Sequence, residues 1–249
     1  SYQSRGDPTA EHPEHLQRTR NLVYGPLGEN VTAILNERFK SIKDIEDTND
    51  YAKGEVLTHS NTPRALIRQQ ILQEIFSRAH LLDYKEILTP LIWNSLEERD
   101  STSADLNGFV IYPKPGPNED LRQRALNIFG KETRELSKEF PLIISGLKIV
   151  RADKYPFTFE DLDTKKAEPA PFLRKSGDYI FVPGKGIVDD KKGVFVWVSE
   201  EQSGLRRFSR YLSDRLDAWF DDLLYSNRRS RVQVLFEPKA QQKNLEDKF

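Results

Sequence analysis

Short apolar runs rich in Val, Ile and Phe recur along this chain, and each is bounded by Gly, Pro or charged residues. Runs of this length and composition are typical of buried β-strands. We interpret six of them as strands: Phe109–Tyr112, Phe140–Ser145, Leu147–Val150, Tyr179–Val182, Val194–Val198 and Arg231–Phe236. A chain with this many short strands is expected to build at least one β-sheet.

The stretch DYKEILTPLIW, residues 83–93, carries the same kind of apolar content and contains the dipeptide Thr89-Pro90. Proline inside or after a run of this kind is expected at the end of a strand. We interpret the stretch as a further core strand that Pro90 closes.

Helical periodicity lies between the strand-like runs. Asn61-Thr62-Pro63 is a helix start in which Thr62 caps and Pro63 takes the first helical position. Asn118 is expected to cap another helix, and apolar residues spaced three and four apart after Gly204 predict one more. The predicted helices are Val31–Ile42, one running on from Pro63, Glu119–Lys138 and Gly204–Tyr225.

The order of these elements predicts the fold class. Helices and strands are mixed without strict alternation, so we expect an α+β fold with a mixed or antiparallel sheet packed with about three to four helices. We expect a flexible arm at 1–20, one domain at 21–238 and a flexible tail at 239–249. Residues 155–171 have three prolines and read as a loop, which makes them the candidate for an internal boundary.

Composition excludes several classes of protein. The chain has 38 basic and 39 acidic residues and no cysteine, so cysteine-based catalysis, disulfides and Cys-ligated metals are excluded. No apolar run approaches the roughly 20 residues of a membrane helix. We therefore expect a soluble intracellular protein without cofactor or metal; the compartment and the oligomeric state stay open.

One alternative comes from a resemblance to a known family. Tyr84, Glu86, Ile87, Thr89 and Pro90 resemble motif 1 of the class II aminoacyl-tRNA synthetases. The resemblance implies an ATP-using enzyme, or a degenerate relative, in which Arg151 and Asp153 stand at motif 2 and Arg206 or Arg207 follows Gly204 at motif 3. It further implies an antiparallel sheet that joins 85–91, 147–151 and 194–198, with Arg151 and Arg206 converging on one nucleotide pocket.

A metal-dependent nuclease is a second alternative. Such an enzyme needs carboxylates and a lysine on adjacent strands, where a metal ion and a water can meet a phosphate. Asp178, Asp189, Asp190, Lys191 and Lys192 supply these residue types. The paired aspartates and lysines lie in a predicted turn, where solvation explains them without catalysis.

Arginines concentrated near the C-terminus lead to the main hypothesis. They are Arg206, Arg207, Arg210, Arg228, Arg229 and Arg231. On a helix that ends in aspartates, early arginines oppose the helix dipole, and an anionic partner would explain them. We expect a non-catalytic binding or assembly protein that contacts RNA or an acidic protein surface through this arginine patch.

Overall fold

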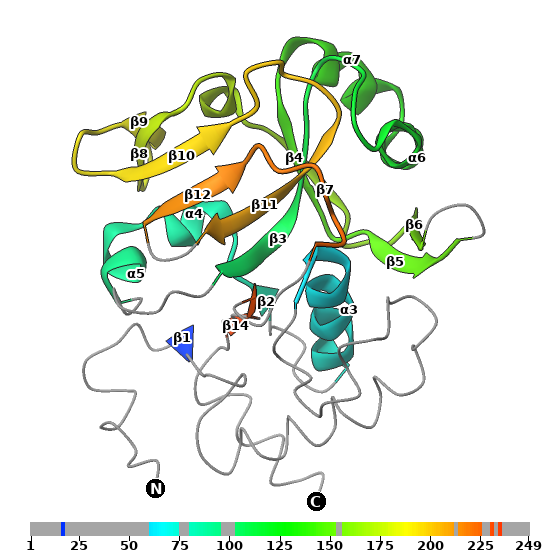
Figure 1. Cartoon of the computed structure of the whole chain (residues 1–249), viewed down its shortest axis with the longest axis horizontal. Coiled ribbons are helices and arrows are strands. Elements are labelled where there is room, and N and C mark those ends of the chain that lie inside the picture. The colour runs from blue at the N-terminus through cyan, green and yellow to red at the C-terminus, as the bar shows by residue number, and fades with distance from the viewer. Residues whose placement is uncertain are drawn as a thin grey trace, which may run out of the picture.

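The main element of the fold is a large mixed sheet, seen in the computed structural model of Figure 1. The structure describes residues 16–17, 60–74, 80–95, 103–152, 156–211, 214–225, 230–231 and 234–235. The predicted helix Val31–Ile42 and the tail after residue 238 lie outside these residues. Of the predicted arm only β1 (Leu16–Gln17) is described, and it pairs with β14 (Val234–Leu235).

Nine strands build this sheet, and the order of eight of them follows one path. They are β7 (Lys166–Pro169), β4 (Leu142–Ser145), β3 (Ser103–Ile111), β11 (Leu205–Tyr211), β12 (Arg215–Ala218), β10 (Val194–Val198), β8 (Gly177–Val182) and β9 (Gly186–Asp189). The ninth, β13 (Ser230–Arg231), pairs with β3. The β10–β12 and β13–β3 pairs are parallel and the others are antiparallel.

Smaller elements surround the sheet (Figure 1). Strands β5 (Lys148–Arg151) and β6 (Phe157–Glu160) form a separate pair, and β14 also pairs with β2 (His80–Leu81). The helices are α3 (Thr62–Gln73), α4 (Tyr84–Ile87), α5 (Pro90–Ser95), α6 (Glu119–Phe129), α7 (Lys131–Glu139) and the 3-10 turn η3 (Pro171–Arg174). The class α+β is confirmed in this coarse form, with five α-helices in the described residues instead of three to four.

The sheet separates two apolar cores. Alternate side chains of β3 point to opposite sides, as the pleat of a strand requires. Phe109 and Ile111 join the core that contains α3, α6 and the β5–β6 pair. Val110 and Tyr112 join the core under α4, η3, β8 and β10. Both faces of β3 are therefore covered.

The first predicted helix start is confirmed within one residue. Helix α3 begins at Thr62 with Pro63 in its first turn, but the capping side chain belongs to Asn61. Asn61 Oδ1 accepts the backbone N–H of Arg64 at 3.0 Å. Thr62 instead donates its hydroxyl to Asp105 Oδ1 at 2.7 Å, which ties the helix to β3.

The predicted helix 119–138 is split in two. Gly130 has φ 89° and separates α6 from α7. Asn118 precedes the helix as expected, yet its side chain forms no cap. It donates to the carbonyls of Leu205 and Asp221 at 2.9 and 2.8 Å, so it joins α6 to the C-terminal strands.

The strand predicted for residues 83–93 is wrong, because this stretch forms α4 and α5. Asp83 Oδ1 accepts the Glu86 N–H at 2.8 Å, and Glu86 Oε2 accepts the Asp83 N–H at 2.9 Å. This reciprocal capping box satisfies two amides at the helix start. Pro90 opens α5 instead of closing a strand.

The helix predicted for Gly204–Tyr225 is also wrong, because the segment contains β11 and β12. The register of β11 against β3 shifts between Arg207 and Ser209, which marks a bulge. Leu205 and Phe208 are three residues apart and lie in different cores. Residues three apart in a strand point to opposite faces, so a spacing that suits one face of a helix here places the two side chains on opposite sides of the sheet.

Two predicted loops contain strands. Residues 155–171 include β7 and β6, and β7 pairs with β4 along its whole length. Residues 183–193, which contain the predicted turn with the paired aspartates, include β9, which forms a hairpin with β8.

The proposed division of the chain into an arm, a domain and a tail stays a prediction. None of the described helices is long and apolar enough to cross a membrane.

Candidate functional site

An exposed group of aromatic side chains lies on one face of the sheet where β11, β12 and β10 run side by side. Residues opposite each other in neighbouring strands share a face. Tyr211, Arg215 and Phe195 form one such cross-strand row, and Ser209, Asp217 and Trp197 form the next. Trp219 follows β12 directly. We call Phe195, Trp197, Tyr211, Arg215 and Trp219 the aromatic face.

The aromatic rings of this face are accessible. Phe195, Trp197, Tyr211 and Trp219 are 38%, 37%, 42% and 43% exposed. The Trp197 and Trp219 rings stack with centroids 5.3 Å apart and planes 8° from parallel. The Arg215 guanidinium lies 5.5 Å from the Trp197 centroid and 5.3 Å from the Tyr211 centroid. These contacts hold the rings in one arrangement while each aromatic residue stays partly exposed to solvent.

The two indoles border an open groove of about 440 Å³. Its lining residues are Pro117, Trp197, Glu200, Glu201, Arg206, Trp219 and Asp221. Three of them are carboxylates, and we call Glu200, Glu201 and Asp221 the acidic rim. With one arginine against three acids, the formal charge of the lining is −2.

A turn at the end of β12 positions Trp219. The Asp217 Oδ1 accepts the backbone N–H groups of Trp219 and Phe220 at 2.8 and 3.1 Å. Asp217 is buried, and burial raises the pKa of its carboxyl above the ordinary value. The two N–H donors and the nearby Arg207 and Arg215 act in the opposite direction, since they favour the carboxylate.

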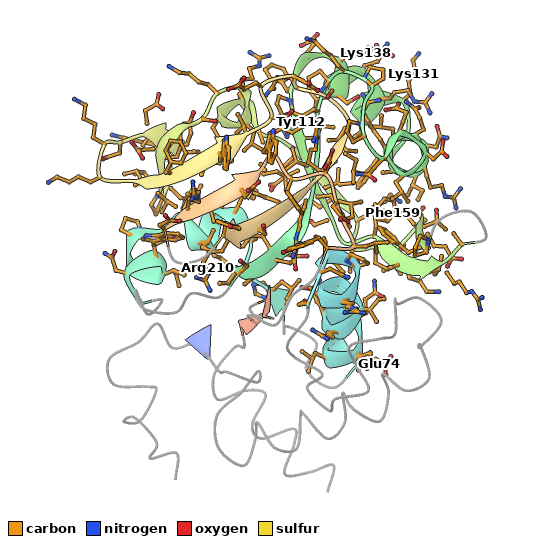
Figure 2. All side chains as sticks on the ribbon, in the orientation of Figure 1. Glu74, Tyr112, Lys131, Lys138, Phe159 and Arg210 are labelled. Atoms are coloured by element: carbon orange, nitrogen blue, oxygen red, sulfur yellow. The ribbon has the colours of Figure 1, made fainter. Side chains whose placement is uncertain are left out.

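Two further buried side chains anchor this turn. Arg206 donates from Nη1 to the Trp219 carbonyl at 3.0 Å and lies 3.4 Å from Asp221 Oδ2. The Tyr112 hydroxyl donates to the Ala218 carbonyl at 2.9 Å and accepts the Ser199 N–H at 3.3 Å. Tyr112, which is labelled in Figure 2, therefore connects the end of β12 with the residue that follows β10. Trp219 comes directly after β12, and Trp197 lies in β10. Burial raises the pKa of Tyr112, so its hydroxyl stays protonated.

Three of the six arginines of the expected patch are buried in the sheet. Arg206, Arg207 and Arg210 lie in β11 with side chains that are at most 5% exposed, not on a solvated helix. Arg210, which is labelled in Figure 2, is fully buried. Arg228 and Arg229 lie outside the described residues, and Arg231 belongs to β13, where only its backbone is described. Three of the six arginines are therefore structural.

Arg207 explains why an arginine occurs inside this sheet. Its Nε and Nη2 donate to Asp105 Oδ1 and Oδ2 at 2.6 and 2.9 Å, and its Nη1 donates to the Tyr225 carbonyl at 2.8 Å. A buried guanidinium needs such partners, because its desolvation is otherwise costly.

The arrangement implied by the synthetase resemblance is not formed by the described strands. Residues 85–91 are mainly helical, and β5 pairs with β6 instead of joining the sheet of β10. Arg151 thus lies in the two-stranded sheet and Arg206 in the nine-stranded one. Asp153 lies outside the described residues.

The carboxylates of the nuclease hypothesis lie at the β8–β9 hairpin. Asp178 is in β8 and Asp189 is in β9, while Asp190 Oδ1 accepts the Lys192 N–H at 2.8 Å and so stabilises the turn. Within the described ranges, no group of three or more His, Asp or Glu is arranged to hold a metal ion.

Comparisons with known proteins give no further guide. No family model, no curated protein and no solved structure matches this chain. The candidate site therefore depends on the geometry of the aromatic face and the groove beside it.

The aromatic face was missed in the sequence. The run VFVWV predicts a strand, but it does not indicate which side chains are exposed, since all five are apolar. In the structure Val194, Val196 and Val198 are buried, and Phe195 and Trp197 are exposed. This alternation cannot be recognised in a run whose residues are all apolar. The large aromatic residues at every second position were the one available signal.

Proposed function

We propose that this protein is a non-catalytic binding or assembly protein, and that a partner protein with a basic segment docks on the aromatic face. The observation that carries the proposal is the exposure of four large aromatic side chains in adjacent rows of one sheet face. Clustered exposed aromatic residues are typical of protein interfaces, where they contribute most of the binding energy.

The preorganisation of the face supports this role. Asp217, Arg206 and Tyr112 are buried, and each donates to or accepts from backbone groups next to Trp219 or Trp197. A rigid aromatic anchor loses little conformational entropy on binding, so its contact area converts efficiently into affinity.

Charge selects the partner. The acidic rim beside the tryptophans disfavours the phosphate backbone of RNA and favours a basic protein segment. The partner surface proposed here thus has the opposite charge to the one expected from the arginine patch, because Arg206, Arg207 and Arg210 are buried.

The test combines recovery of the natural partner with a footprint. The tagged full chain is isolated from its native cells with its bound protein, and the pair is then reconstituted from purified components. Hydroxyl-radical footprinting should show Trp197 and Trp219 protected in the complex. Replacing both with Thr should weaken binding at least about tenfold, as expected for interface anchors.

Tyr225 provides a matched control. Its ring is exposed, yet it lies outside the two cross-strand rows of the aromatic face. The variant Tyr225→Ser should bind as the wild type does. A complex in which Trp197 and Trp219 keep their full reactivity, or one that ribonuclease dissolves, would overturn the proposal.

A further inference from the structure

We infer that the groove beside Trp197 and Trp219 is a subsite for an arginine side chain of the partner. The inference rests on the proposed function and specifies which chemical group the aromatic face recognises. The guanidinium would lie against the indoles with its N–H groups directed at the acidic rim.

The first argument is that the aromatic face, including the groove indole Trp197, already holds a guanidinium of this chain. Arg215 lies over Trp197 at 5.5 Å and over Tyr211 at 5.3 Å from the ring centroids. A planar, weakly hydrated guanidinium stacks on aromatic faces better than a lysine ammonium does. The aromatic face therefore has the geometry that guanidinium binding requires.

The second argument is the position of the carboxylates. Glu200 and Glu201 come two and three residues after the end of β10, three and four residues from Trp197, and Asp221 stands two residues after Trp219. Both indoles and all three carboxylates line one groove. Aromatic rings with carboxylates at their edge match the two features of an arginine head group, its flat face and its fork of donors.

The third argument concerns Arg206, the one cation of the lining. Its Nη1 lies 3.4 Å from Asp221 Oδ2 and donates to the Trp219 carbonyl, while its Nε donates to the Ser203 carbonyl at 2.9 Å. Arg206 is therefore engaged and buried. In the described residues Glu200 pairs with no cation, and Glu201 accepts only the Ser203 hydroxyl at 3.3 Å.

The fourth argument separates an organic cation from a metal ion. In the described part of the chain, no three or more His, Asp or Glu side chains are arranged to hold a metal ion, and this includes the acidic rim. The groove volume of about 440 Å³ lies in the range of about 300–1,000 Å³ that is usual for ligand sites. Carboxylates spread around such a space suit a head group with several N–H donors.

The experiment uses the full chain and three 12-residue peptides that differ only at three positions, which carry arginine, lysine or citrulline. Citrulline keeps the shape of arginine and removes its charge. The chain has three tryptophans, so three indole N–H signals report on binding in ¹⁵N NMR titrations. The arginine peptide should shift the signals of Trp197 and Trp219 and leave that of Trp93 in place.

The affinities should follow the charge and the shape of the head group. We expect the citrulline peptide to bind at least about tenfold more weakly than the arginine peptide, and the lysine peptide to lie between them. The variant Glu200→Gln/Glu201→Gln should weaken arginine-peptide binding about fivefold or more. The variant Glu132→Gln/Glu139→Gln, which removes two exposed acids of α7, should leave it unchanged.

Equal binding of the citrulline and arginine peptides would overturn the inference, as would an unchanged affinity in Glu200→Gln/Glu201→Gln. Shifts produced by an oligouridine RNA and not by the arginine peptide would overturn it in favour of RNA. If the natural partner protects Trp197 and Trp219 while the arginine peptide shifts neither, the docking proposal stands and the arginine subsite fails.

Discussion

Arg207 and Asp105 form a bidentate ion pair inside the protein, with the two N–H···O distances at 2.6 and 2.9 Å. The Thr62 hydroxyl donates to the same carboxylate, so β11, β3 and α3 meet at Asp105. Both members of the pair are at most 4% exposed. The pair thus positions α3 on the sheet.

We predict that removing the charge of one member of this pair destabilises the folded protein strongly. Asp105→Asn leaves the Arg207 guanidinium buried without its counter-charge and should lower the free energy of unfolding by about 3–5 kcal/mol. Urea unfolding measures the loss. The double variant Asp105→Leu/Arg207→Met should lose less free energy of unfolding than the sum of the losses measured for Asp105→Leu and Arg207→Met alone.

The surface pair Lys138–Glu135 is the control. It is formed at 2.7 Å on α7, with both side chains mostly exposed (Figure 2 shows Lys138). Lys138→Met should change the free energy of unfolding by about 1 kcal/mol or less, since solvent screens the pair. Equal losses from Asp105→Asn and Lys138→Met would contradict the structural role assigned to Asp105.

The buried Asp217 predicts a pH dependence of stability. Because burial raises the pKa of its carboxyl in the folded state, the folded protein holds this proton more tightly than the unfolded chain. Its contribution to stability is therefore largest below the ordinary value of 3.8 and is lost as the pH rises through the raised pKa.

Asp217→Asn isolates this contribution, because asparagine keeps an oxygen that can accept the N–H groups of Trp219 and Phe220. The free energy of unfolding of the wild type minus that of the variant should increase as the pH falls from 7 toward 4. Urea titrations across this range give the difference. A difference that is independent of pH, or that falls with acid, contradicts the prediction.

Tyr112→Phe should loosen the alignment of the two tryptophans. Loss of the hydroxyl leaves the Ser199 N–H and the Ala218 carbonyl without this buried partner, at an expected cost of about 1–2 kcal/mol. Near-ultraviolet circular dichroism should show a weaker signal from the Trp197–Trp219 stack. Tyr211→Phe, which alters an exposed ring, serves as the control, and equal effects of the two variants would contradict the assignment.

Two glycines allow a matched test of close packing. Gly146 and Gly184 have positive φ values of 70° and 80°, which disfavour any side chain. A Cβ at Gly146 would overlap the Thr164 carbonyl, whereas one at Gly184 would meet nothing. Gly184→Ala should cost about 1 kcal/mol and Gly146→Ala about 2 kcal/mol or more in thermal or urea unfolding. Equal losses would mean that backbone strain alone acts at both positions.

Local signals explain where the secondary structure could be predicted. Asn61-Thr62-Pro63 starts a helix as expected, because capping and the fixed φ of proline act within a few residues. Asp83, Glu86 and the Thr89-Pro90 dipeptide are comparable signals for a helix start. The apolar residues between them, however, favour a strand. The reciprocal Asp83–Glu86 cap was available in the sequence as an acid–x–x–Glu pattern.

Non-local pairing explains where the prediction failed. The spacing of Leu205, Phe208 and Leu216 suits one face of a helix, and nothing within the segment shows that Leu205 and Phe208 lie in different cores. Arg207 looks like a surface residue until Asp105, 102 positions away, is placed beside it. An interior partner so distant in sequence could not be inferred from the arginine itself.

The sequence by itself determined the α+β class and located the strands β3, β4, β5, β8 and β10, because β-branched and aromatic runs and helix caps act locally. Only the tertiary structure decided which side of each strand is exposed. The pairing of β10, β12 and β11 brings Phe195, Trp197, Tyr211 and Trp219 to one open face and buries Arg206, Arg207 and Arg210. That choice depends on strand register, since a shift of one residue would exchange the two faces.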